Sequence, residues 1–378
     1  MARTRDGAPD RSGGHRHRPR MAREQLGRLH DPEVGRAGAD PLRRTDLGRG
    51  GCRRRGSAPR HGGDPIAHDR TRGARLSNAR CGAGLVIRVG TAGWSYRDWE
   101  GIVYPSRKPP GFHPIAHLAR SFECVEINAS FYAAPRAEHA ASWVRMVRDR
   151  PNFRFTAKLL QSFTHGTVRS SAAFEAEARA WLEGVGPLLE SDRLAAVLVQ
   201  FPVSFEPHAD SFVRLDRIHA AFGHLPLVFE LRHRDWFTAA MLRRIERMGA
   251  SLAMIDLPDS HVHPPRDAAA VGPIGYLRLH GRNSETWFTR GVGRDARYDY
   301  LYTPGEVKEL ARTAKRLAAG VDDTYVITNN HFAGKAAVNA LELLVEFGGE
   351  VPRAPSELVD AYPRLRPHVR TEGQQNLF

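Results

Sequence analysis

The stretch YLRLHG (residues 276–281) decides the fold, because its side chains alternate between two kinds of surface. Leu277 and Leu279 are apolar, whereas Arg278 and His280 are polar. Successive side chains of a strand point to opposite faces of a sheet, so the stretch predicts a strand with one apolar and one polar face. A sheet of such strands would enclose a polar site.

Seven other stretches have the same character, and helical patterns separate them. The eight expected strands are residues 86–93, 123–130, 153–159, 195–201, 226–232, 251–256, 276–281 and 324–330, and the clearest helices are 137–149, 212–222, 241–249 and 305–320. Alternating strands and helices predict parallel βαβ units, and eight units in about 270 residues match an α/β protein with a single (β/α)8 TIM-type barrel. A doubly wound sheet is the alternative, since a strand count does not show closure.

The last of these helices has a recognisable start. Thr303-Pro304-Gly305-Glu306 predicts a capping box with proline at the first helical position.

The charge of the chain is unevenly distributed. Residues 1–84 hold 20 arginines, no lysine and nine acidic residues, so they carry +11 of the net charge of +14. Their Arg- and Gly-rich composition has no periodic apolar pattern, which indicates a disordered segment. It is either a nucleic-acid-binding arm or sequence that is not part of the genuine protein. The barrel is then expected over residues 85–361, with a flexible tail over 362–378.

Membrane and secretory classes are not indicated. No apolar run approaches the roughly 18 residues of a membrane span, and the N-terminus lacks the apolar part of a signal peptide. The three cysteines, Cys52, Cys81 and Cys124, have neither metal-binding nor disulfide spacing. We therefore expect a cytoplasmic protein without membrane partners.

The polar faces of the expected strands carry the candidate catalytic groups. If the apolar faces meet the helices, the polar residues point into the barrel, and most stand late in their strands, where such barrels build active sites. Glu126 and Glu230 could divide the roles of general acid and base. A self-satisfied ion network that stabilises the barrel is the alternative. The catalytic candidates are Glu126, Glu230, Arg232, Asp256, Arg278 and His280, and Arg88 shares their inward phase and is expected at the same polar mouth of the barrel.

A second group of residues is expected to bind the substrate. Phosphate often binds after the seventh and eighth strands of such barrels, and a helix predicted over 335–347 offers its N-terminal amides to an anion. Aromatic side chains at the same rim could stack on a base or a sugar. The binding candidates are Trp94, Tyr96, Asn128, Tyr132, Lys158, Gln200, Arg282, Asn283, Asn330, His331 and Lys335.

A divalent metal is a possible cofactor at the same rim. His165, His233, His280 and His331 each follow an expected strand. Zinc or manganese needs three or four such ligands that converge on one point. The sequence leaves open whether these side chains converge.

Several long motifs resemble the YecE-like family, domain of unknown function 72. They are TAGWSYRDWEGIVYP (91–105), VEINASFYAAP (125–135), FTAKLLQSFTH (155–165), VQFPVSF (199–205), FELRHRDW (229–236), YLRLHGRNSETW (276–287), YDYLY (298–302) and NNHFAGKAAVNA (329–340). The resemblance covers residues 86–350 and implies a TIM-type barrel without a settled activity. The barrel nucleases of the endonuclease IV and xylose isomerase group are comparable only in fold.

The segment QQNLF (374–378) resembles the motif by which bacterial replication and repair proteins bind the DNA sliding clamp. Gln374 would bond at the edge of the clamp pocket, and Leu377 and Phe378 would fill it. The motif usually has an apolar second residue, where this chain has Gln375. A sliding clamp is therefore an expected partner.

Three functions are consistent with these patterns. The first is a hydrolase-like enzyme on a phosphate-bearing substrate, such as nucleic acid in repair or replication. The second is an enzyme on a small sugar or sugar phosphate, such as an isomerase. The third is a non-catalytic barrel that binds nucleic acid or protein. A narrow, deep pocket would favour the second, and an open groove with exposed aromatic residues and arginines would favour the others.

Overall fold

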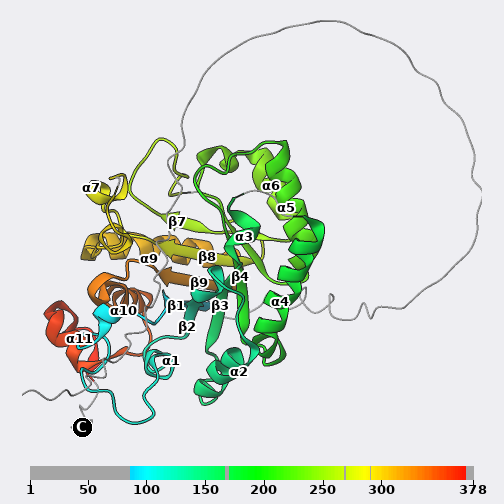
Figure 1. The fold of residues 1–378 in the computed structure, drawn as a ribbon. Coiled ribbons are helices and arrows are strands. Elements are labelled where there is room, and N and C mark those ends of the chain that lie inside the picture. The colour runs from blue at the N-terminus through cyan, green and yellow to red at the C-terminus, as the bar shows by residue number, and fades with distance from the viewer. Residues whose placement is uncertain (1–85, 167–169, 268–269, 290, 372–378) are drawn as a thin grey trace, which may run out of the picture. The chain divides into compact units, whose positions relative to one another are not determined.

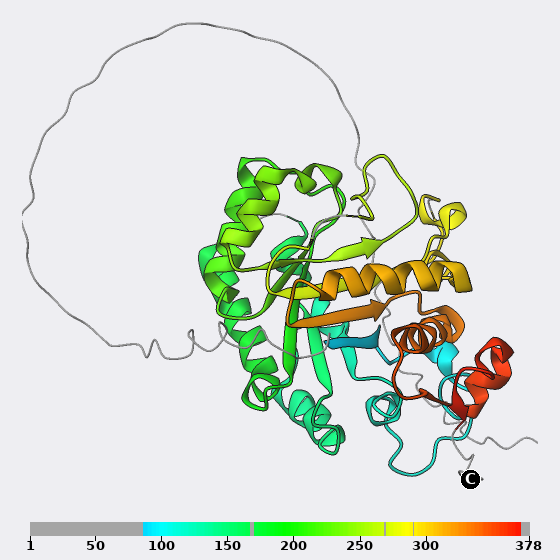
Figure 2. The same ribbon diagram turned by 180° about the vertical axis from the view of Figure 1, so that it is seen from behind.

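The computed structural model describes residues 86–166, 170–267, 270–289 and 291–371. In this part of the chain, nine parallel strands form one sheet in the order β6-β5-β4-β3-β2-β1-β9-β8-β7, with helices around it (Figures 1 and 2). The expected basic segment, residues 1–84, and the QQNLF motif both lie outside the described residues.

All eight expected strands are present, and the sixth is divided in two. The strands are β1 (Val86–Ala92), β2 (Cys124–Ile127), β3 (Arg154–Lys158), β4 (Leu194–Gln200), β5 (Leu227–Glu230), β6 (Ser251–Leu252), β7 (Met254–Asp256), β8 (Ile274–Leu279) and β9 (Asp323–Thr328). β6 pairs with β5 and β7 pairs with β8, so the two edges of the sheet meet at Ala253. The sheet closes into a TIM-type barrel, and the doubly wound alternative is wrong.

Helices connect the strands and cover the outside of the barrel. The α-helices are α1 (Pro114–Leu118), α2 (Ala137–Met146), α3 (Gln161–Thr164), α4 (Ser171–Glu190), α5 (Ala209–Phe222), α6 (Ala239–Arg247), α7 (Ser284–Trp287), α8 (Arg294–Arg297), α9 (Pro304–Ala318), α10 (Lys335–Phe347) and α11 (Ser356–Ala361). Short 3-10 helices are η1 (Arg97–Trp99), η2 (Ala129–Phe131), η3 (Arg234–Phe237), η4 (Phe332–Gly334) and η5 (Pro363–Leu365). The capping box predicted for α9 is confirmed at Thr303 and Glu306.

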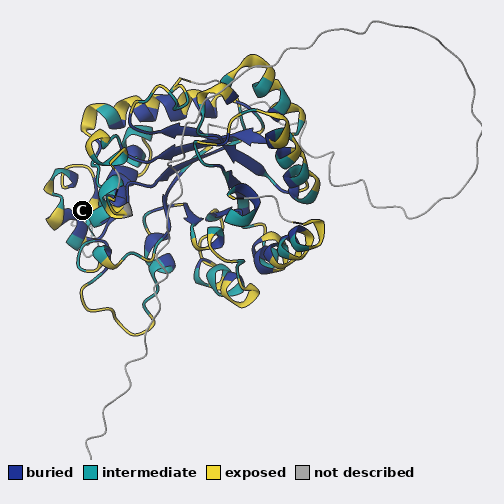
Figure 3. Ribbon diagram, turned by 45° about the horizontal axis from the view of Figure 1, so that its top comes forward, coloured by how far each residue is buried: buried dark blue, intermediate teal, exposed yellow. Residues whose placement is uncertain are grey.

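Apolar side chains fill the layer between strands and helices. Phe229 of β5 shares one cluster with Trp181 of α4 and Phe222 of α5, and Leu279 of β8 shares another with Leu310 of α9. In Figure 3 the strands are buried, whereas the outward faces of the helices are exposed. Each fully buried side chain of this size contributes about 1.5–3 kcal/mol of transfer free energy.

The interior of the barrel changes from apolar to polar along its axis. Cys124, Leu198, Tyr276 and Ile327 form an apolar layer inside it. Polar side chains lie at the carboxyl ends of the strands, where the alternation places them. The inward orientation is confirmed for Glu126, Lys158, Gln200, Glu230, Arg278 and His280, which contact one another there.

Two residues expected at the polar mouth lie elsewhere. Asp256 points out of the barrel, because it pairs in register with outward-facing Leu279 and accepts hydrogen bonds from Arg282 and Tyr302. Arg88 does point inward, but it bonds Asp323 at the amino-terminal end of the barrel. The prediction that both contribute to the mouth is therefore wrong.

The chain beyond α11 is folded where a flexible tail was expected. β10 (Arg353–Ala354) pairs with β11 (Arg370–Thr371), and the side chain of Leu365 between them is fully buried. Arg364 donates a 2.7 Å hydrogen bond to the carbonyl of Tyr302. The predicted tail boundary at residue 362 is thus too early.

No helix in the described part of the chain is both long enough and apolar enough to cross a membrane.

Candidate functional site

A buried arginine organises the centre of the barrel mouth. Arg278, at the end of β8, donates two hydrogen bonds to Glu126 of β2, at 3.0 and 2.7 Å, and a third to Glu230 of β5. All three side chains are fully buried. Burial alone would raise the pKa of Glu230, but Arg278 and then Arg232 outweigh it and hold this pKa well below its usual range.

Arg232 and His280 complete this cluster. Arg232 donates to Glu230 at 2.9 Å, and the Nε2 atom of His280 lies 3.8 Å from the same carboxylate. Asn329 donates to the Nδ1 atom of His280 at 3.0 Å. Burial, and next the charge of Arg278, lowers the pKa of His280 well below its ordinary value. His280 is therefore neutral at neutral pH.

Lys158, the last residue of β3, reaches this cluster from the other side. Its amine donates to Gln200 at 3.1 Å and lies 3.9 Å from Glu126. Burial, and next repulsion by Arg278, lowers the pKa of Lys158 to about 7, although the two carboxylates oppose the shift. A large part of the protein therefore carries a free amine at neutral pH.

The charges around Lys158 balance without it. Glu126 and Glu230 bring two negative charges, and Arg278 and Arg232 bring two positive ones. An ammonium group on Lys158 would add a buried positive charge that the cluster does not compensate. The charge balance and the lowered pKa therefore both favour the free amine, which coexists with the ammonium form at neutral pH.

A cavity of about 270 Å³, here called the mouth cavity, opens above this cluster. Segments after β1, β2 and β9 supply most of its wall, and Lys158 supplies its basic group. The lining residues are Gly93, Trp94, Ser95, Tyr96, Asn128, Ala129, Tyr132, Lys158, Tyr298, Asn329 and His331. Six of the predicted binding residues are thus brought together, namely Trp94, Tyr96, Asn128, Tyr132, Lys158 and His331.

Aromatic rings form one wall of the mouth cavity. The ring of His331 stacks on Tyr96, with 4.4 Å between centroids, and lies 5.3 Å from Tyr298. The loop that carries His331 is fixed two residues later by Ala333, which adopts a left-handed backbone with φ of 52°. Asp98 accepts from the Ala333 amide at 2.6 Å, which offsets part of the strain of that conformation.

One amide group of the wall is left with unused hydrogen-bonding capacity. The Oδ1 atom of Asn128 is buried and accepts no hydrogen bond from the residues that the structure describes. A buried acceptor without a donor is unfavourable by about 1–3 kcal/mol. The Asn128 residue itself lines the mouth cavity.

Four predicted phosphate-binding residues have other partners. Arg282 bonds Asp256, and Lys335 bonds Asp299. Asn283 donates to the carbonyls of residues 296 and 299, and Asn330 donates to Asn339 on α10. Gln200 also lies outside the cavity lining, because its side chain accepts from Lys158 and Arg278.

Five residues of the mouth cavity were absent from the binding candidates, namely Gly93, Ser95, Ala129, Tyr298 and Asn329. Asn329, rather than Asn330, faces inward, in phase with Tyr325 and Ile327 of β9, so the alternation of TYVITNN contained this signal. Tyr298 comes from a loop after α8, where no periodicity applies. Burial raises the pKa of Tyr298, so its phenol keeps its proton at neutral pH.

The predicted metal ligands do not form a recognisable metal centre. Among the described residues, no group of three or more His, Cys, Asp or Glu side chains lies close enough to hold an ion. His165 lies against Phe131 and Thr164, whereas His233 lies near Glu206 and Asp235.

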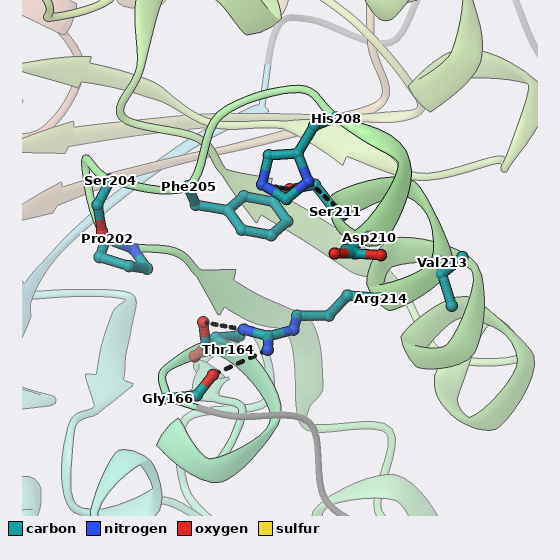
Figure 4. A pocket seen from close by; sticks show the side chains of 10 residues that line it. All are labelled: Thr164, Gly166, Pro202, Ser204, Phe205, His208, Asp210, Ser211, Val213 and Arg214. Carbon is teal, nitrogen blue, oxygen red and sulfur yellow. Dashed lines mark hydrogen bonds between the residues drawn. The ribbon is translucent and has the colours of Figure 1, made fainter. Parts of the chain in front are cut away.

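A second hollow of about 390 Å³ lies between the end of α3 and the start of α5 (Figure 4). Arg214 extends from α5 and donates to the carbonyls of Thr164 and Gly166, at 3.3 and 2.8 Å. The hollow shares no lining residue with the mouth cavity. Its arginine ties α5 to the segment at the end of α3 and is occupied by that role.

Comparison with known proteins finds relatives of this chain, some of them with solved structures of a similar fold. Protein YunF of Bacillus subtilis is 28% identical over 291 residues, which are 71% of this chain and 98% of YunF. YecE of Escherichia coli K12 is 25% identical over 49% of this chain and 64% of YecE. A DUF72 family protein of known structure from Thermotoga maritima is 32% identical, covers 68% of this chain and 97% of its own, and has a TM-score of 0.59.

The family model for "Protein of unknown function DUF72" matches residues 88–361, which span the barrel and α11. The chain belongs to the YecE-like DUF72 family.

Proposed function

We propose that the mouth cavity is the active site of an enzyme that moves a proton on a small sugar or sugar phosphate. The observation that carries this proposal is a buried amine, Lys158, at the edge of a small cavity walled by rings and amides. The buried ion cluster beneath it holds that amine in place, and burial with the charge of Arg278 lowers its pKa to about 7.

The size of the mouth cavity favours a small molecule. Its volume of about 270 Å³ is below the range of roughly 300–1,000 Å³ found for drug-sized ligands. The rings of Tyr96 and His331 offer an apolar wall, while Asn128 offers a buried acceptor for a hydroxyl group. Rings and hydrogen-bonding amides together suit a compound with carbon–hydrogen faces and several hydroxyls.

The chemistry of Lys158 suits proton transfer. A base with a pKa near the working pH combines an adequate free fraction with adequate basicity. Lys158, with a pKa of about 7, would remove a proton from the carbon beside a carbonyl and return it to the neighbouring carbon. Tyr298, which keeps its phenolic proton, would donate to the oxygen that becomes negative.

Nucleic acid is the less favoured substrate. Phosphate backbones are bound by cations that are free to face them. Arg278, Arg282 and Lys335 each hold a carboxylate partner. Most of the positive charge of the chain lies in residues 1–84, outside the described barrel.

The proposed activity predicts exchange of substrate protons with solvent. A panel of aldoses, ketoses and their phosphates is incubated with the protein in heavy water, and deuterium at the carbon beside the carbonyl is followed by NMR. We expect exchange with at least one member of the panel, slowed by about 100-fold or more in Lys158→Met, because general-base catalysis contributes this much.

Two matched variants sharpen this experiment. Asn128→Leu should weaken substrate binding, whereas Gln161→Leu, which changes a partly exposed amide of α3 outside the mouth cavity, should not. Absence of exchange across the panel, or equal exchange in Lys158→Met, would refute the proposal.

We also propose that QQNLF docks on a DNA sliding clamp, an interaction that would bring the barrel to sites of replication or repair. A five-residue anchor should bind in the micromolar range, or about −8 kcal/mol. Calorimetry of a peptide ending in residues 374–378 against purified clamp should show this affinity, and Leu377→Ala and Phe378→Ala should each abolish it. Binding that tolerates both alanines would count against docking.

A further inference from the structure

We propose that Lys158 condenses with the carbonyl carbon of a small anionic aldehyde or ketone to form an imine. This inference rests on the proposed function, because it assigns a covalent role to the same cavity. It goes further in two respects: it makes Lys158 a nucleophile in place of the base, and it requires a negative charge on the substrate.

The position of the amine suits nucleophilic attack. Lys158 lines the mouth cavity and is held by the hydrogen bond that it donates to Gln200 at 3.1 Å. The ring of Phe131, centred 5.5 Å from the amine nitrogen, covers another side. A desolvated lysine beside other cationic groups is an activated nucleophile toward carbonyl compounds.

The charge balance beneath the cavity specifies the substrate. Glu126 and Glu230 are already matched by Arg278 and Arg232. A protonated imine on Lys158 would be one buried positive charge in excess, as an ammonium would be. A carboxylate or phosphate on the substrate would compensate it, so anionic carbonyl compounds should react better than neutral ones.

The condensation balances in atoms and protons. The amine nitrogen bonds to the carbonyl carbon, and one proton moves from nitrogen to the former carbonyl oxygen. The carbinolamine then loses its hydroxyl group as water, with a proton that Tyr298, which lines the same cavity, is placed to supply. The immediate products are a protonated imine, the Tyr298 phenolate and one water molecule. Transfer of the nitrogen-bound proton back to the phenolate gives the neutral imine, and addition of water reverses the reaction.

The scarcity of lysine makes this step easy to test. The chain has five lysines, and the four besides Lys158 are Lys108, Lys308, Lys315 and Lys335. The first three of these are exposed, and Lys335 is paired with Asp299. An ordinary lysine is only about one part in two thousand amine at pH 7.

The full chain is incubated at pH 7 with dihydroxyacetone phosphate or with dihydroxyacetone, and sodium borohydride reduces any imine to a stable secondary amine. Intact-mass measurement and peptide mapping should show one adduct, at Lys158, forming about 100-fold faster than at any other lysine. Lys335→Met should retain the adduct and Lys158→Met should lose it. Dihydroxyacetone phosphate should label Lys158 about tenfold faster than neutral dihydroxyacetone, which corresponds to a free-energy difference of about 1.4 kcal/mol.

The possible results separate this inference from the proposed function. Proton exchange without an adduct overturns the imine and leaves the proton-transfer proposal standing. An adduct at Lys158 without proton exchange supports the imine and overturns the proton-transfer proposal. Labelling spread evenly over the five lysines overturns the imine, and equal labelling by the two ketones overturns the requirement for an anion.

Discussion

Replacing Arg278 by methionine is expected to destabilise the protein by roughly 4 kcal/mol or to prevent folding, because buried Glu126 loses its guanidinium partner and buried Glu230 keeps only Arg232. Arg278 is fully buried and donates to both Glu126 and Glu230. Methionine fills a similar volume but offers no donor. Urea denaturation, followed by circular dichroism, measures the free energy of unfolding of both proteins.

The pH dependence of the same variant gives a second measurement. Without Arg278, burial raises the pKa of the Glu230 carboxyl above that of the unfolded chain, about 4.3 for glutamate. A group whose pKa is raised on folding stabilises at pH values below the unfolded pKa and loses this contribution as the pH rises through the folded one. The deficit of Arg278→Met should therefore shrink as the pH falls from 7 toward 4.

A surface pair provides the control. Arg366 lies 3.1 Å from Asp360, and both side chains are largely exposed. Arg366→Ala should change the free energy of unfolding by less than about 1 kcal/mol. A similarly small change in Arg278→Met would mean that Glu126 and Glu230 are solvated or protonated, contrary to the ion cluster described above.

The barrel could be predicted because its signals are local. Each strand has a period of two and each helix a period close to 3.6, so the order of elements follows from neighbouring residues. Closure could not be predicted in this way. It depends on the pairing of β6 with β5 before Ala253 and of β7 with β8 after it. Alternation shows which face a residue occupies, but not which strand lies beside it.

The candidate site was predicted where one face of a strand is clearly polar. In VEIN, Glu126 and Asn128 alternate with two apolar residues, so their inward phase is unambiguous. In SLAMID the four residues before Asp256 are apolar on both faces, and the prediction that Ala253 and Ile255 face the helices while Asp256 faces inward was wrong. The carboxylate is stabilised outside the barrel by Arg282, a partner that the sequence pattern does not reveal.

The position of a residue along the barrel axis and the pairing of residues distant in the chain could not be predicted from the sequence either. Arg88 has the inward phase but stands at the start of β1, far from the carboxyl ends of the strands. Lys335 looked available for phosphate, yet it bonds Asp299, which lies 36 positions earlier in the chain. Such pairs form only when the fold has brought their elements together.

Replacing Lys158 by methionine is expected to stabilise the protein at pH 7 by about 2–4 kcal/mol, opposite in sign to the effect at Arg278. The pKa of Lys158 falls from 10.5 in the unfolded chain to about 7 in the folded one. This difference sets an upper bound of about 5 kcal/mol on the destabilisation that the lysine brings. A buried amine that weakens the fold is typical of a functional group rather than of a structural one.

The pH dependence identifies the cause of that stabilisation. Because the folded protein binds this proton less tightly than the unfolded chain, the penalty of Lys158 is complete below pH 7 and disappears as the pH rises toward 10.5. The advantage of Lys158→Met should therefore shrink between pH 7 and 10. Lys335→Met, which removes a lysine with a carboxylate partner, should show no such advantage. A Lys158→Met variant that is less stable than the wild type at pH 7 would show that Lys158 is a charged member of the ion cluster.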